Sequence, residues 1–233
     1  MKLDHENVQR FYETEYYGGA EATGSLPWHT RLMARRLEPL KGAAVLDVAC
    51  GTGRWLELLA RRGARPSGID ISATAIGQAQ ARMPQADLRV GVGEDLPFED
   101  ASFDLVTCMG SLEHFLDQGG ALKEMRRVAR ANARILILVP NAGFLTRRLG
   151  LYKGTQQVAI RETVRPIREW EALFADAGLS VEKRWRDLHP LSLGWIGHGA
   201  PRAWPLRAMQ ALALAFWPIA WQYQVHFLCR ARG

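Results

Sequence analysis

An apolar run that ends in two closely spaced glycines constrains this chain more than any other stretch. Residues 45–53 read VLDVACGTG, and residues 54–62 continue with the periodicity of a helix. A buried strand that enters a glycine turn and leaves as a helix begins a nucleotide-binding βαβ unit. Gly51 and Gly53 let the backbone turn sharply and approach a ligand, because no Cβ occupies that space. We therefore expect an α/β fold with its ligand at this turn.

An acidic residue closes the next apolar strand. That strand covers residues 66–70 and ends at Asp70. Carboxylates at this place in βαβ units accept hydrogen bonds from ribose hydroxyls. The dinucleotide fingerprint also requires a third glycine three residues after Gly53, and Leu56 stands there. A nicotinamide-dependent oxidoreductase is therefore disfavoured, although it stays open as an alternative that a nucleotide titration separates.

Composition limits the class of protein. The chain has 233 residues, 48% of them hydrophobic and 23% charged, which is enough for one sizeable globular domain. A net charge of +6 allows anionic partners or membrane surfaces, but the basic runs are interspersed with acids, which favours ordinary solvated helix faces. Three widely spaced cysteines and an N-terminus without an apolar segment predict a reducing, cytoplasmic environment.

One further acidic residue connects the glycine turn with a known family. Asp47 lies on the first strand, four residues before Gly51, and Ala49 stands between them. The pattern resembles the class I S-adenosylmethionine (SAM)-dependent methyltransferases, in which Ala49 would replace the usual first glycine. The resemblance covers about residues 40–186. It implies a Rossmann-like, doubly wound sheet of seven strands, mostly parallel with an antiparallel last strand at one edge. It also implies SAM as the cofactor and S-adenosylhomocysteine as its product.

The resemblance extends to the segment that follows the third strand. Residues 91–98 read GVGEDLPF, and the next strand opens with Phe-Asp at 103–104. Val92 occupies the place of the family's adenine-facing aspartate, so the adenine amino group needs another acceptor, such as Glu94 or a backbone carbonyl. Leu96 or Phe98 would then line the face of the ring. The cofactor-binding residues that the resemblance implies are Asp47, Ala49, Gly51, Gly53, Asp70, Ile71, Gly93, Glu94, Asp95, Leu96, Met109, Gly110 and Tyr16.

A histidine follows the fourth strand, at the sheet edge where open α/β sheets bind their ligands. An imidazole near neutral pH can take the proton of a hydroxyl group during methyl transfer, so His114 is our candidate general base. The Glu113–His114 pair also resembles metal-assisted quinone O-methyltransferases. Those enzymes carry another carboxylate just upstream, and residues 110–112 offer none. We therefore predict no metal.

The expected activity is O-methylation of a small or lipid-linked hydroxyl acceptor. Methylation of nucleic-acid amino groups is disfavoured, because residues 108–111 read CMGS where base-modifying enzymes have an acidic or amide residue and two prolines. RNA methylation by another route stays open. A protein of this fold that binds SAM or a partner without turnover is the other alternative.

The chain outside the resemblance divides into further parts. Residues 7–17 and 28–40 are expected to form helices that close over the cofactor, with Tyr16, Tyr17 and His29 as lid residues or as packing on the sheet. A basic helix is expected to carry Lys123, Arg126, Arg127 and Arg130 on one face. The predicted organisation is a helical lid at 1–40, a SAM-binding core at 41–186, an apolar insertion at 187–221 and a closing strand at 222–233.

The insertion at 187–221 is too short to span a bilayer, but it is apolar nearly all round after Gln210. The sequence leaves open whether a dimer partner, the domain's own core or a lipid surface buries the apolar side chains of this insertion. We expect the insertion to form the acceptor side of the site and to favour a hydrophobic or lipid-linked substrate, because aromatic side chains and nearby arginines suit an amphiphile. These residues are Trp195, Trp204, Trp217, Trp221, Arg202 and Arg207.

Overall fold

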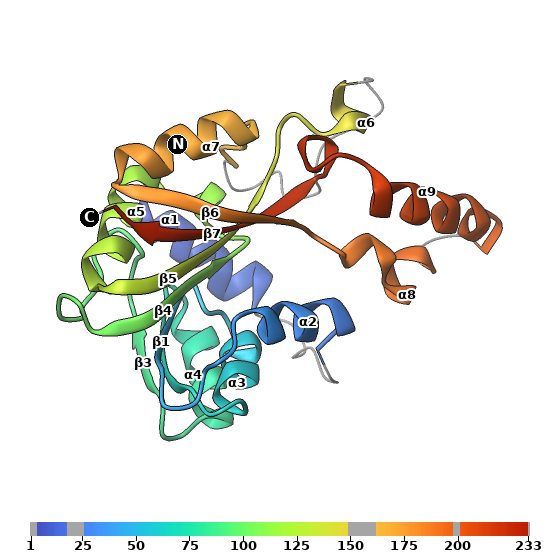
Figure 1. Cartoon of the computed structure of the whole chain (residues 1–233). Coiled ribbons are helices and arrows are strands. Elements are labelled where there is room, and N and C mark those ends of the chain that lie inside the picture. The colour runs from blue at the N-terminus through green and yellow to red at the C-terminus, as the bar shows by residue number, and fades with distance from the viewer. Residues whose placement is uncertain (1–3, 18–25, 149–161, 198–200, 233) are drawn as a thin grey trace.

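A sheet of seven strands organises the protein (Figure 1). The computed structural model describes residues 4–17, 26–148, 162–197 and 201–232. The strand order is β3-β2-β1-β4-β5-β7-β6, in which β1 to β5 are parallel and β7 runs antiparallel to both of its neighbours. The strands are β1 (Ala44–Val48), β2 (Arg65–Asp70), β3 (Asp87–Val90), β4 (Phe103–Met109), β5 (Ala129–Pro140), β6 (Leu179–Arg186) and β7 (Gln224–Ala231).

This topology confirms the predicted Rossmann-like fold and its antiparallel last strand. The expected place of that strand was wrong by one position, because β7 inserts between β5 and β6 and leaves β6 at the edge. Pairing on both sides satisfies the backbone of β7, whose residues 225–229 are buried.

Helices cover both faces of the sheet. On one face α5 (Gln118–Val128) and α7 (Ile167–Asp176) bury Leu122, Met125, Trp170 and Phe174 against the strands. On the other face α2 (Trp28–Arg36), α3 (Arg54–Ala60) and α4 (Ala73–Arg82) pack around a second cluster of buried side chains. Strand alternation divides the side chains between the two clusters, since Leu46 faces the first and Val45 the second.

Local chemistry explains where these helices begin and end. Ser72 caps α4 by accepting from the Ala75 amide, and Asp117 caps α5 by accepting from the Gly120 amide. Gly178 follows α7 with a φ of 78°, a conformation that suits a residue without a Cβ. Ser72 therefore starts α4, and Gly178 ends the turn after α7.

Two predicted boundaries were wrong. The basic helix ends at Val128, and β5 begins at Ala129, so Arg130 lies on a strand and pairs with Asp104 at 2.6 Å. The second N-terminal helix stops at Arg36 instead of continuing to residue 40, because Pro39 disfavours helical backbone at the residue before it. The first N-terminal helix, predicted at residues 7–17, is α1 (His5–Phe11), which continues as a π-helical turn (Tyr12–Tyr16).

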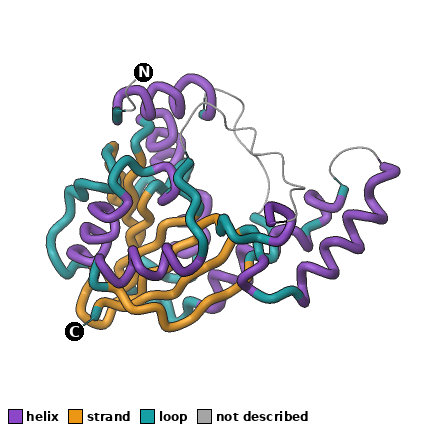
Figure 2. Tube along the Cα trace, turned by 90° about the horizontal axis from the view of Figure 1, so that it is seen from above, coloured by secondary structure: helices purple, strands orange, loops and turns teal. Residues whose placement is uncertain are grey.

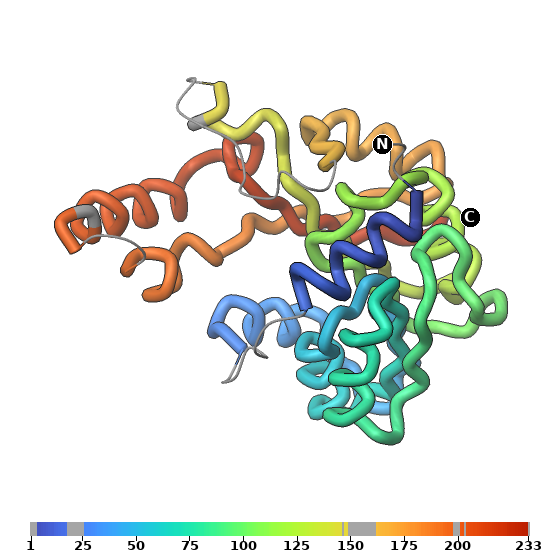
Figure 3. Tube along the Cα trace, turned by 180° about the vertical axis from the view of Figure 1, so that it is seen from behind, coloured from blue at the N-terminus to red at the C-terminus, as the bar shows by residue number. Residues whose placement is uncertain are grey.

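The insertion projects from the sheet as an arm, which we define as residues 187–221 (Figures 1 and 2). Its long helix α9 (Trp204–Phe216) has one buried residue, Ala211, so the arm does not close the core. Figure 3 shows the arm from behind, on the same side of the molecule as α2. The remaining short helices are the 3-10 turns Leu112–His114, His189–Leu191, Pro201–Ala203 and Ile219–Trp221, with α6 (Leu145–Arg148) and α8 (Leu193–Ile196).

Polar side chains fix the base of the arm to the sheet. Arg186, at the end of β6, donates from Nη1 to the Ala215 carbonyl at 2.6 Å, and Gln222 donates from Nε2 to the Leu214 carbonyl at 2.7 Å. Both carbonyls belong to the last turns of α9, where intrahelical donors are missing. In the described part of the chain, no helix is long and apolar enough to cross a bilayer.

Candidate functional site

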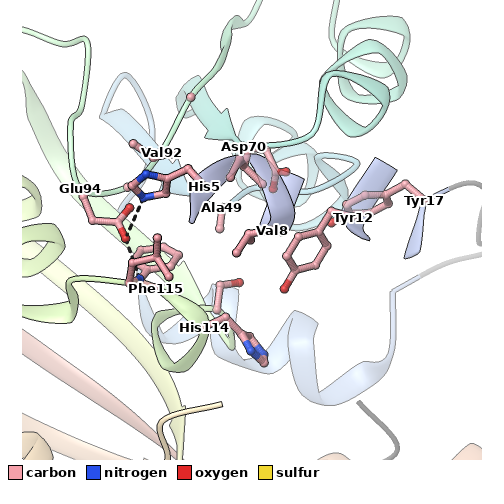
Figure 4. Close-up of a pocket in the computed structure, with 15 residues that line it drawn as sticks. His5, Val8, Tyr12, Tyr17, Ala49, Asp70, Val92, Glu94, His114 and Phe115 are labelled. Atoms are coloured by element: carbon pink, nitrogen blue, oxygen red, sulfur yellow. Dashed lines mark hydrogen bonds and ion pairs between the residues drawn. The ribbon is translucent and has the colours of Figure 1, made fainter. Parts of the chain in front are cut away.

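A pocket opens at the carboxyl edge of the sheet (Figure 4). The loops after β1, β2, β3 and β4 form its walls, and α1 with the turn that follows it lies across the opening. Among the predicted site residues, those that line it are Ala49, Asp70, Ile71, Gly93, Glu94 and His114. Tyr17, named above as a lid residue or as packing on the sheet, and Val92, at the family's adenine-facing position, also line it. The wall residues that the sequence did not single out are His5, Val8, Tyr12, Gly91, Ser111, Phe115 and Leu116.

Asp70 connects the glycine turn with the start of α4. Its Oδ2 accepts from the Gly51 amide at 2.8 Å, and its Oδ1 accepts from the Ser72 amide at 3.0 Å. The side chain is 5% exposed and lines the pocket, and burial raises its pKa. Each carboxylate oxygen has two lone pairs, so both oxygens can still accept a bond from a ligand hydroxyl.

The two glycines of the turn serve different contacts. Both have positive φ, 53° at Gly51 and 75° at Gly53. A Cβ at Gly51 would lie 2.7 Å from the Tyr17 hydroxyl, whereas a Cβ at Gly53 would lie 2.8 Å from Met83 and 2.9 Å from the Ala79 side chain. Because Gly51 has no Cβ, the Tyr17 side chain can lie against the turn beside the pocket. Because Gly53 has none, α3 and α4 can pack closely.

Asp47 lies behind the pocket, in the sheet. It is 2% exposed and accepts from the Thr107 hydroxyl at 2.5 Å, and that hydroxyl in turn accepts from Trp55 Nε1 at 3.2 Å. Burial raises the pKa of Asp47 to about 7. This network fastens β1 to β4 and to α3, so Asp47 supports the turn from below and is not in the pocket wall.

Glu94 holds three segments together at the other end of the pocket. Its Oε1 accepts from the Leu116 amide at 2.9 Å and lies 3.6 Å from His5 Nε2 (Figure 4). Beside it, a Cβ at Gly93 would lie 2.5 Å from the Phe115 ring, so only glycine lets this ring pack there. The loop after β3, the loop after β4 and the N-terminal helix thus meet at one carboxylate.

Several predicted cofactor residues lie outside the pocket wall. Tyr16 is 53% exposed, and its neighbour Tyr17 faces the pocket instead. Leu96 and Phe98 are buried in the core, and Asp95 is exposed. The helical register of the N-terminal segment, which decides between Tyr16 and Tyr17, depends on how it docks on the sheet. The other predicted residues outside the wall are Asp47, Gly51, Gly53, Met109 and Gly110.

Three side chains that can ligate a metal meet beside the pocket. Ligand atoms of Glu113, His114 and Glu162 all lie within 4.8 Å of one another. Glu113 Oε2 and His114 Nδ1 are buried without a hydrogen-bond partner, so the donor set fits a divalent cation. Our prediction of no metal depended on a missing carboxylate upstream, and Glu162 supplies one from far downstream. The absence of a metal therefore stays a prediction, because spacing along the chain does not reveal a carboxylate that joins the pair from far downstream.

The protonation states of Glu113 and His114 also suit this cluster when no cation is bound. Burial raises the pKa of Glu113 to about 8, so this carboxyl group holds its proton at neutral pH. Burial lowers the pKa of His114 below 6.5, and the charge of Glu162 opposes that shift. A neutral imidazole beside a carboxylate is an arrangement that can accept a proton at pH 7.

Comparison with known proteins agrees with this geometry. A family described as "Methyltransferase domain" matches residues 46–137. A ubiquinone biosynthesis O-methyltransferase of Xanthomonas axonopodis pv. citri is 33% identical over 67% of this chain and 70% of its own length. Another, of Xylella fastidiosa, is 35% identical over 62% of this chain, and the match spans 63% of that protein, less than two thirds.

A solved structure repeats the fold over the whole chain. Magnesium protoporphyrin IX methyltransferase from Synechocystis, with S-adenosylhomocysteine bound, superposes with a TM-score of 0.64 and covers 99% of this chain and 100% of that one. The two sequences are 16% identical, so this likeness concerns the fold.

Proposed function

This chain belongs to the class I SAM-dependent methyltransferases, and we propose that it transfers the sulfonium methyl group to a hydroxyl group of a small or lipid-linked acceptor. The observation that carries the proposal is the pocket in which a buried carboxylate, Asp70, and a neutral imidazole, His114, share one cavity. The carboxylate suits the cofactor's ribose, and the imidazole suits the proton that O-methylation releases. The relatives named as O-methyltransferases support the same acceptor atom.

The cofactor would lie along the strand ends in a fixed direction. Its ribose would bind Asp70, and its adenine would lie near Gly93, Glu94 and the Phe115 ring. The rest of the molecule would then extend past the turn after β1 toward β4. Glu94 Oε1 already accepts two backbone amides, so a backbone carbonyl is the better partner for the adenine amino group.

The chemical step is an in-line displacement. The acceptor oxygen forms a bond to the methyl carbon while the carbon–sulfur bond breaks, and S-adenosylhomocysteine leaves with the electron pair on sulfur. The hydroxyl proton passes to His114, and Glu162 stabilises the imidazolium that results. A divalent cation held by Glu113, His114 and Glu162 would instead polarise the acceptor hydroxyl directly.

Calorimetry with SAM, S-adenosylhomocysteine and NAD tests the cofactor, and labelled SAM incubated with lipid, glycan and nucleic-acid fractions tests the acceptor. We expect SAM and its product to bind more tightly than NAD, and label to enter a small-molecule or lipid fraction. Tighter binding of NAD would support the oxidoreductase alternative. Binding of SAM with no label transferred to any fraction would support a protein without turnover.

The arm supports a membrane-proximal acceptor. It exposes large apolar side chains on α8 and α9, among them Leu193 at 86% and Phe216 at 84%. Arg207 donates to the Trp195 carbonyl at 2.7 Å and lies over that ring, so it holds α8 against α9. We therefore assign lipid contact to the apolar residues and head-group contact to Arg202. A cytoplasmic protein that touches the membrane through this arm fits these features, and a homodimer formed through the same residues is the competing arrangement.

Replacing Leu212, which is 63% exposed on α9, by aspartate is expected to abolish binding to anionic liposomes. The new charge cannot enter the acyl boundary, and Arg202→Ala should weaken binding less and reduce its salt dependence. Liposome co-sedimentation measures this, with Val90→Asp as the control, because Val90 is exposed on β3 at the other end of the sheet. A stable dimer that dissociates on Phe216→Asp, with no liposome binding by the wild type, would contradict lipid contact.

A further inference from the structure

The end of the cofactor pocket beside β3 is the part that would hold the adenine ring, if the proposed function holds. The loop after β3 supplies Val92 to this end, and the loop after β4 supplies Phe115 and Leu116. These three side chains are apolar, so they can pack against the face of any purine. An apolar wall discriminates weakly between bases that differ only in the polar groups at their edge. Selection of one base therefore requires a polar group of the protein at that edge.

The carboxylate at this end of the pocket is already in use. Glu94 Oε1 accepts from the Leu116 amide at 2.9 Å and from the Asp117 amide at 3.4 Å, which binds Glu94 to the loop after β4. Asp95, the next acidic residue, is exposed and lies outside the pocket wall. The backbone carbonyl proposed above takes one hydrogen of the adenine amino group, but this group carries two. The second hydrogen needs another acceptor.

Most other polar side chains of the wall belong to different parts of the pocket. Asp70 is the carboxylate assigned to the ribose, and the lid residues Tyr12 and Tyr17 both interact electrostatically with it. Ser111 and His114 follow β4, where the methyl group and its acceptor would meet. One polar side chain of the wall remains, and it comes from the N-terminal helix.

His5, the first residue of α1, is that side chain (Figure 4). It lines the pocket together with Val92 and Glu94, and its Nε2 lies 3.6 Å from Glu94 Oε1. The carboxylate favours the imidazole form that carries a proton on Nε2, and in the neutral ring Nδ1 is then an acceptor. Among the described residues none donates a hydrogen bond to Nδ1, and 47% of the side chain is exposed, which leaves surface for a ligand to cover.

The docking of α1 holds His5 in this place. Asp4 caps the helix by accepting from the Asn7 amide at 2.9 Å, so His5 stands on the first turn. Val8 is buried in the same pocket wall, and residues three apart share one face of a helix. In the π-helical turn after α1, Glu13 Oε1 accepts from the amide of Ala73 at the start of α4, at 3.3 Å. His5 therefore faces the pocket when the N-terminal segment is docked on the sheet.

We propose that His5 selects adenine as the base of the cofactor, with its Nδ1 accepting one hydrogen of the 6-amino group. This inference rests on the proposed function, since it requires a SAM-type cofactor in this pocket. Hypoxanthine carries an oxygen at position 6, so it has no hydrogen to donate there and directs a lone pair at Nδ1. Glu94 acts as a positioning residue, because it orients the ring of His5. His5 lies outside residues 46–137, the part of the chain that matches the family.

Calorimetry with S-adenosylhomocysteine and S-inosylhomocysteine, which differ in the base alone, tests the proposal. At about pH 8, where ordinary imidazoles are neutral, the wild-type protein is expected to bind the adenosyl compound ~10-fold or more tightly than the inosyl compound. His5→Phe keeps a ring and removes the acceptor, so it should lower this preference by ~5-fold or more, chiefly by weakening the adenosyl compound. The ratio of the two affinities is the decisive quantity, because damage to the N-terminal helix weakens both compounds alike.

Two further variants serve as controls for the effect of His5→Phe. His5→Asn places an amide oxygen near the position of Nδ1 and should keep most of the preference for the adenosyl compound. Glu6→Phe puts the same new ring on the adjacent, exposed position of α1, outside the pocket wall, and should leave both affinities unchanged. Thermal unfolding of each variant checks that the fold is intact.

Two results would overturn the proposal: the wild type binds both compounds within ~2-fold of each other, or the wild-type preference persists unchanged in a folded His5→Phe protein. Failure of the wild type to bind either SAM or S-adenosylhomocysteine would instead reject the proposed function itself. Binding of both cofactor forms without a preference over the inosyl compound would reject only the role of His5.

Discussion

Replacing Asp70 by alanine is expected to weaken SAM binding by roughly 5- to 150-fold, which corresponds to ~1–3 kcal/mol. The two carboxylate oxygens would lose their bonds to the ribose hydroxyls, and bonds to a charged acceptor are stronger than neutral ones. The substitution also removes the acceptors of the Gly51 and Ser72 amides, so the turn after β1 would be held less firmly. Calorimetry with SAM measures the loss.

Two matched variants serve as controls for the effect of Asp70→Ala on SAM affinity. Asp70→Asn keeps the side chain's size and one acceptor oxygen, and should lose less affinity than the alanine variant. Asp176→Ala removes an exposed carboxylate at the end of α7 and should bind SAM as the wild type does. Thermal unfolding of each variant separates a local loss from a destabilised fold. An unchanged SAM affinity in a folded Asp70→Ala protein would remove Asp70 from the cofactor site.

Replacing His114 by alanine is expected to lower the rate of methyl transfer by ~100-fold or more, with little change in SAM affinity. Its pKa lies below the usual 6.5 because the ring is buried, so the neutral form that accepts a proton is present at pH 7. The wild-type rate should therefore hold through the pH range in which an ordinary histidine titrates and fall only at lower pH, and this acid limb should be absent from the alanine variant. Single-turnover rates across pH measure both effects.

A chelator distinguishes whether His114, with Glu113 and Glu162, acts as a proton acceptor or as a metal ligand. With EDTA present, the wild-type rate is expected to persist, since His114 acts as a proton acceptor beside Glu162. A rate that is lost with EDTA and restored by Mg²⁺ would instead make His114 a metal ligand together with Glu113 and Glu162. A rate for His114→Ala within a few-fold of the wild type would leave His114 as a packing residue.

What the sequence determined about this protein is its local chemistry. The glycine turn at 51–53 and the carboxylate of Asp70 depend on backbone conformation and on residues close together in the chain. Apolar periodicity then distinguishes strands from helices, because each period places side chains on one face. These signals predicted the α/β fold, and the resemblance to the SAM-dependent methyltransferases implied the antiparallel last strand and the SAM cofactor.

Only the tertiary structure decided which distant segments meet. Glu162 meets Glu113 and His114 from far along the chain, and Tyr17 rather than Tyr16 faces the pocket. The position of β7 between β5 and β6 and the projection of the arm from the sheet also depend on contacts between distant segments. The hydrophobic pattern of a segment shows that its apolar face must be buried. It does not show which other segment buries that face, because arrangements of similar local energy differ in their long-range contacts.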